Sequence, residues 1–159
     1  FAKEYLYNAV FSAAKINSYP EDAYAVMEAE MRKQADDVMS SYREYLEERL
    51  GDVSEEYVFD YMQKEIFGEE TYDDIEDLIR GVVTGQMDYI IINNVLADEL
   101  GVEYSYDEYA KDVQALVSSS ADYEITVEEF ESGMLGGKHY YYAYFLYDKI
   151  VEALADKVM

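Results

Sequence analysis

The predicted fold depends most on residues 18–50, SYPEDAYAVMEAEMRKQADDVMSSYREYLEERL. Pro20 suits the first turn of a helix, where a main-chain N–H would have no partner in any case. Glu21 and Asp22 place negative charge near the positive end of the helix dipole. Gly51 follows the stretch and is typical of a helix C-terminus. We therefore predict one long helix of roughly 45 Å, longer than a compact domain of this size is wide.

Apolar residues recur along this predicted helix at steps of three or four positions, with a mean of about 3.5. They are Tyr24, Met27, Met31, Ala35, Val38, Tyr42 and Tyr45. This spacing is typical of a coiled-coil seam rather than of a wide stripe that faces a core. Because the helix would be longer than the domain, we expect part of it to project as an arm.

The composition is that of an acidic, aromatic-rich chain. Its 159 residues are 50% hydrophobic, so it can bury a core, and we predict a single helical domain over residues 1–159. Twelve Lys and Arg against 36 Asp and Glu give a net charge of −24. This charge repels phosphate backbones and anionic membrane surfaces, so we expect no nucleic-acid partner. The longest fully apolar run, Tyr89–Ile92, is too short for membrane insertion.

The remaining sequence predicts further helices, most of which begin or end at capping signals. Capping boxes at Ser105–Glu108 and Thr126–Glu129, with a similar pattern at Thr71–Asp74, mark three of the starts. No segment alternates with period two between turns, so the predicted fold class is all-α. The predicted helices cover Ala2–Asn17, Glu55–Phe67, Tyr72–Leu100, Tyr106 to about Val117, Thr126 through Phe130, and Lys138 to the last residue.

Residue patterns that support catalysis are missing from the chain. An EF-hand loop needs acidic residues at alternate positions around a central Gly, and no acidic stretch here has that pattern. A di-iron helical bundle needs two Glu-x-x-His motifs, but the single histidine, His139, has no Glu three positions before it. No glycine-rich phosphate-binding loop with a lysine occurs. We therefore expect no enzymatic activity and no metal or other cofactor.

Hydrophobic surface is the remaining functional signal. The final predicted helix opens with HYYYAYFLY over residues 139–147, and the long helix adds several methionines beside two tyrosines. Methionine adapts its shape to different partners, and a tyrosine ring meets both water and apolar groups. The alternative, that these side chains only pack in a core, stays open. The predicted peptide-binding residues are Met27, Met31, Met39, Tyr42, Tyr45, Tyr140, Tyr144 and Tyr147.

Several short segments also occur in a particular order along the chain. They are Pro20 with Glu21 and Glu30 in VMEAEM and its flanks, Leu100-Gly101-Val102 followed by Ser105-x-x-Glu108 in VLADELGVEYSYDEY, and Lys149 with Leu154 in DKIVEALADKV. With the order of the helices, these segments resemble the C-terminal domain of trigger factor. The peptide-binding helical domain of the SurA-type periplasmic chaperones is similar. The resemblance covers nearly the whole chain as an order of elements.

The resemblance implies an elongated multi-helix domain with arm-like projections that cradles unfolded or nascent polypeptides without ATP. The ribosome-binding and prolyl-isomerase domains of that family would lie upstream of Phe1, so any contact with the ribosome would be made there. Trigger factor implies a cytoplasmic location, whereas the SurA-type chaperones imply an extracytoplasmic one. Two other functions stay open: a structural module that forms a homodimer or binds a fixed partner through the seam, and the non-catalytic helical part of a peptidyl-prolyl isomerase.

Overall fold

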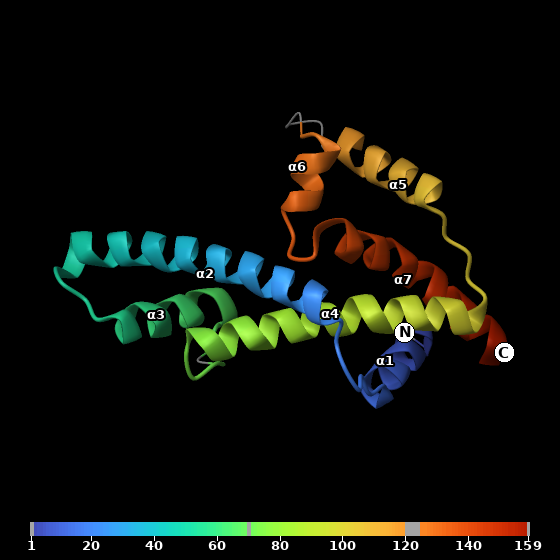
Figure 1. Ribbon diagram of the computed structural model, residues 1–159, viewed down its shortest axis with the longest axis horizontal. Helices are drawn as coiled ribbons and strands as arrows, with labels where there is room; N and C mark the ends of the chain where they lie inside the picture. Colours follow the sequence, from blue (N-terminus) through green and yellow to red (C-terminus); the bar gives the residue numbers. More distant parts are fainter. Residues whose placement is uncertain (1, 70, 120–124, 159) are drawn as a thin grey trace. The chain divides into compact units, whose positions relative to one another are not determined.

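The computed structural model describes residues 2–69, 71–119 and 125–158. Over these ranges the chain forms seven α-helices and no strand, which confirms the predicted all-α class (Figure 1). Phe1 and Met159, the ends of the predicted domain, lie outside the described residues. The helices are α1 (Ala2–Ala13), α2 (Glu21–Leu50), α3 (Glu55–Phe67), α4 (Ile75–Leu100), α5 (Tyr106–Ser119), α6 (Val127–Ser132) and α7 (Gly137–Val158).

Local capping chemistry sets several of the helix ends as predicted. At the start of α5, the Ser105 N–H donates to Glu108 Oε2, and the Glu108 N–H donates to Ser105 Oγ. At the start of α6, Thr126 and Glu129 form the same reciprocal pair. Helix α3 has the predicted bounds and ends at Gly68, whose φ of 78° is left-handed. These bonds satisfy main-chain groups that a helix end leaves without an intrahelical partner.

Two predicted boundaries at the first corner are wrong, one by four residues and the other by one. Helix α1 ends at Ala13 rather than at Asn17, and residues 14–20 contain no helical turn and no sharp bend. Helix α2 begins at Glu21, because Pro20 has an extended backbone (φ −60°, ψ 113°) and precedes the helix instead of forming its first turn. The long predicted helix is otherwise continuous to Leu50.

The predicted start of the second long helix is also wrong. Helix α4 begins at Ile75, where Asp74 Oδ1 accepts a hydrogen bond from the Asp77 N–H at 2.8 Å. The predicted capping role of Thr71 is absent because its N–H donates to Gln63 Oε1 on α3 instead. A tertiary contact thus delays the helix start that the local pattern predicts.

The residue contacts divide the chain into two compact units, and α4 contributes to both of them. Unit 2, Pro20–Gly85, contains α2, α3 and the first part of α4. Helix α2 packs along α3 in this unit. Its buried apolar side chains are Met27, Ala35, Met39, Leu46, Val58, Phe59, Met62, Leu78, Ile79 and Val83.

Gln63 stabilises the segment between α3 and α4 in unit 2. Its side chain is fully buried, and its Nε2 donates to the Tyr72 carbonyl at 2.9 Å. Its Oε1 accepts from the N–H groups of Thr71 and Tyr72 at 3.0 and 2.7 Å. One amide side chain therefore satisfies three main-chain groups of Thr71 and Tyr72, which lie outside the helices.

Gln63→Ala should lower the free energy of unfolding by about 2 kcal/mol, because it leaves these main-chain groups without their partner. Urea unfolding followed by circular dichroism measures this change. Gln34→Ala is the matched control, since Gln34 is exposed on α2 of the same unit and its loss should cost no more than about 0.5 kcal/mol. Equal stability of the two variants would contradict the structural role of Gln63.

Unit 1 comprises the residues up to Tyr19 and those from Gln86 onward, with α1, the second part of α4, α5, α6 and α7. Helix α7 packs against α1, α5 and α6. One cluster of buried side chains in this unit consists of Tyr7, Ala97, Tyr104, Tyr109, Val113, Leu146, Ile150 and Val151.

A buried polar link joins three helices of unit 1. Asn93 on α4 is fully buried, and its Oδ1 accepts a hydrogen bond from the Tyr7 hydroxyl of α1 at 2.7 Å. Its Nδ2 donates to the Ala143 carbonyl of α7 at 3.2 Å. Because a buried polar group is costly unless it is bonded, Asn93 fixes how α1, α4 and α7 meet.

Candidate functional site

The five predicted binding residues on α2 all lie in unit 2, and most of them pack inward. Met27 and Met39 are buried in its core, and Met31 and Tyr42 are partly buried. The rings of Tyr42 and Tyr45 lie near Tyr61 of α3, with centroids 6.0 and 6.3 Å apart. Core packing, the alternative left open by the sequence, therefore describes Met27 and Met39.

The three predicted binding residues on α7 lie in unit 1. The ring of Tyr147 meets Tyr7 edge-on at 4.6 Å, and Tyr140 lies 5.5 Å from Tyr89. Tyr144 is the most open of the three, with 51% of its surface exposed. The predicted set is therefore divided between the two units, and only part of it is exposed.

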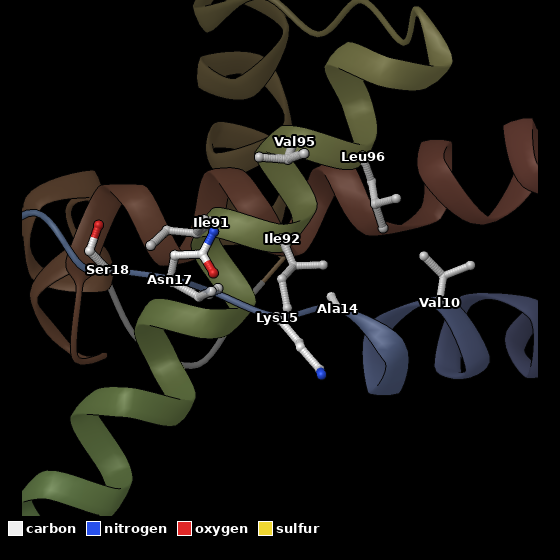
Figure 2. Close-up of a pocket in the computed structure, with 10 residues that line it drawn as sticks. Val10, Ala14, Lys15, Asn17, Ser18, Ile91, Ile92, Val95 and Leu96 are labelled. Carbon is white, nitrogen blue, oxygen red and sulfur yellow. The ribbon is translucent and has the colours of Figure 1, made fainter.

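An apolar groove occurs in unit 1 at a place that the sequence pattern did not single out (Figure 2). One wall is the end of α1 with the chain that follows it, and the other is a face of α4. Its volume is about 380 Å³, at the small end of the range for ligand pockets. The lining residues are Val10, Ala14, Lys15, Ile16, Asn17, Ser18, Ile91, Ile92, Val95 and Leu96.

The groove leaves apolar surface uncovered. Figure 2 shows Ile92 and Leu96 pointing from α4 toward the chain that follows α1. Ile92 is buried, whereas Val10 is 37% exposed and Val95 is 53% exposed. The exposure of Val95 shows that this half of α4 is not buried on all sides. An apolar ligand in the groove would gain from covering these side chains.

The chain that forms one wall of the groove has an open backbone. We call residues 14–19 the connection. At its first end the Ala14 N–H donates to the Val10 carbonyl, and at its other end the Tyr19 hydroxyl donates to Asp88 Oδ1 of α4 at 2.5 Å. Between these points, residues 15–18 make no hydrogen bond with any part of the chain that the structure describes. The connection is therefore fixed at both ends while its middle can bond to other molecules.

The charge near the groove is negative at one end. Asp98 and Glu99 lie in the last turn of α4, three and four positions after Val95, and that turn contains no basic residue. Residues at these spacings are neighbours on one helix face. Within the described ranges neither carboxylate forms an ion pair, and the helix dipole adds negative charge at the same end. Lys15 lines the groove, but its Nζ points away from α4 in Figure 2.

Tyrosines between α5, α6 and α7 form a second aromatic cluster, which serves packing. The Tyr104 hydroxyl donates to Asp112 Oδ2 at 2.7 Å, and the Tyr109 hydroxyl donates to Glu131 Oε1 at 2.5 Å. Burial, helped by these acidic partners, raises the pKa of both phenols above the usual value. These neutral, bonded hydroxyls stabilise the core of unit 1.

Two kinds of feature are absent from the residues that the structure describes. No cluster of three or more His, Cys, Asp or Glu side chains in these ranges is arranged to bind a metal ion. None of the helices, over the same ranges, combines the length and the apolar character that crossing a membrane requires.

Comparison with known proteins adds no relative. No family model matches the chain, and neither a curated protein nor a solved structure matches it. The groove and the charge around it are therefore the features that point to a function.

Proposed function

We propose that this chain binds unfolded or extended polypeptides without ATP, as a chaperone module, and that the groove of unit 1 is a place where a client is held. The observation that carries this proposal is the open apolar groove with exposed Val10 and Val95 beside an unbonded stretch of backbone. Apolar surface favours segments that a folded protein would hide. The order of helices that resembles trigger factor supports the same function, in the cytoplasm or, by the SurA-type resemblance, outside it.

The net charge of −24 supports this proposal in two ways. It attracts basic, unfolded clients at long range, and it keeps a loaded complex from associating with further copies. Both effects should weaken as salt screens the charges. A small groove and diffuse charge suit weak binding of many sequences.

The alternative of a module that pairs through the α2 seam has less support. Met27, Ala35 and Met39 of that seam are already buried within unit 2. A second copy could not reach them without opening this unit. Sedimentation at micromolar concentration should therefore show no tight dimer formed through the seam.

Suppression of client aggregation tests the proposed function. The chain at an equimolar ratio should slow light scattering by an aggregating basic client. Val10→Ser with Val95→Ser should weaken client binding about thirtyfold, because each removed side chain loses roughly 1 kcal/mol of apolar contact. A wild-type chain that gives no protection at several-fold excess would contradict the proposal.

Val26→Ser is the matched control for this experiment. Val26 lies on α2 of unit 2 and is 59% exposed, close to the 53% of Val95, so the two changes remove similar exposed surface. The control should protect the client as well as the wild type does. If Val26→Ser lowers protection as much as the groove variant does, the groove is not the binding place.

A further inference from the structure

The open backbone of the connection has a consequence for how a client must bind. A ligand that fills the groove also covers residues 15–18 and removes water from their N–H and C=O groups. Those groups have no hydrogen bond within the described chain. Burying these polar groups without hydrogen-bond partners costs free energy. A ligand that binds well must therefore supply both hydrogen-bond donors and acceptors. A polypeptide backbone in an extended conformation does so at regular spacing.

A helical ligand fits these observations less well. An amphipathic helix bonds its own backbone groups and would bring only side chains to the groove. It would then cover the connection without bonding to it. An extended segment instead presents alternate side chains to one side, so that every second residue can enter the apolar groove.

The connection needs little rearrangement to pair with an extended segment. The bonds at Ala14 and between Tyr19 and Asp88 hold its two ends on unit 1. Residues 14–20 contain no turn or sharp bend, and no described residue other than glycine has a positive φ. Little ordering of the chain is therefore needed before a second strand is added, which lowers the entropy lost on binding.

We propose that the client adds as a β-strand along residues 15–18, places alternate apolar side chains in the groove, and directs a Lys or Arg toward Asp98 and Glu99. This inference rests on the proposed function and specifies its binding mode. The two carboxylates are neighbours of Val95 on α4, carry no ion pair within the described ranges and lie at the negative end of the helix. A cationic side chain at that end of the client complements them.

N-methylated peptides test the strand pairing. The probe is a labelled peptide with apolar residues at alternate positions and one terminal Arg, titrated with the chain by fluorescence anisotropy. Methylation of the amides along one edge of the peptide should weaken binding at least tenfold, whereas methylation of the other edge should have little effect. Equal binding of both methylated peptides, or a helical circular dichroism signal from the bound peptide, would overturn strand pairing.

Charge variants test whether a cationic side chain of the client pairs with Asp98 and Glu99. Asp98→Asn with Glu99→Gln should weaken binding of the Arg peptide several-fold and leave a peptide with norleucine in place of Arg unaffected. Asp36→Asn with Asp37→Asn is the control, because these exposed neighbours on α2 change the net charge equally. An equal loss in both variants would mean that only the overall charge matters, which contradicts a specific pairing.

Different results would contradict strand pairing and client binding. If the methylated peptides bind as well as the parent while the wild type still suppresses aggregation, strand pairing is wrong and the proposed function stands. If the wild type binds no peptide and protects no client, the proposed function itself is wrong.

Discussion

Asn93→Asp is expected to destabilise the protein strongly at neutral pH. The new carboxyl group would keep one oxygen toward the Tyr7 hydroxyl, but it would place the other against the Ala143 carbonyl, where Nδ2 now donates at 3.2 Å. Two acceptors would then face each other, and the charge would be fully buried. The expected loss is about 4 kcal/mol, a large part of the stability of a typical domain. Thermal unfolding followed by circular dichroism measures it.

Acidification should partly rescue this variant. A protonated carboxyl group carries no charge and can donate its proton to the Ala143 carbonyl, so the deficit relative to wild type should shrink as the pH falls. Asn94→Asp is the control, because Asn94 is the exposed neighbour and its Nδ2 bonds only to Ile90 of its own helix. If Asn93→Asp is as stable as Asn94→Asp at neutral pH, the buried link does not hold the three helices together.

Strong alkali is expected to unfold unit 1 cooperatively. Burial raises the pKa of Tyr7 to about 12, and it raises the pKa of Tyr89, Tyr104 and Tyr109 above the usual value as well. A phenol with a raised pKa stabilises the fold fully below its unfolded pKa of about 10. That stabilisation is lost as the pH rises through the folded value, because the phenolate must leave the core. Far-UV circular dichroism and tyrosinate absorbance in one titration measure both events.

The late rise in tyrosinate absorbance should coincide with the loss of helix. Tyr109→Phe should reduce the amplitude of this late phase, since it removes the buried hydroxyl that bonds Glu131. Tyr5→Phe should leave the loss of helix unchanged, because Tyr5 is exposed on α1. Full ionisation near pH 10 with intact helices would contradict the burial of these phenols.

The helix ends that the sequence predicts correctly depend on hydrogen bonds between residues close together in the chain. The capping boxes at Ser105 and Thr126 and the glycines at positions 51, 68 and 101 act through bonds within a few residues, so their patterns mark helix ends correctly. The all-α class follows from the same patterns. The predicted capping role of Thr71 is absent, because its N–H donates a hydrogen bond to Gln63 on another helix, which the local pattern does not reveal.

The candidate site depends on residues that are distant in the sequence. Val10 and Ile16 meet Val95 and Leu96 only because α1 and the connection lie along α4. The end of α1 at Ala13 opens the backbone of the connection, although Ala14 and Lys15 are good helix formers. Methionine and tyrosine content pointed to α2 and α7 instead, and periodicity alone does not separate a core residue such as Met27 from an exposed one.

Hydrogen exchange resolved by residue, with and without a bound unfolded client, determines whether a client covers the backbone of residues 15–18. We expect the client to slow amide exchange along residues 15–18, where no hydrogen bond within the described chain protects the backbone, and we expect this protection to be lost with Val10→Ser and Val95→Ser. Client binding that leaves exchange at residues 15–18 unchanged and protects other parts of the chain would contradict the claim.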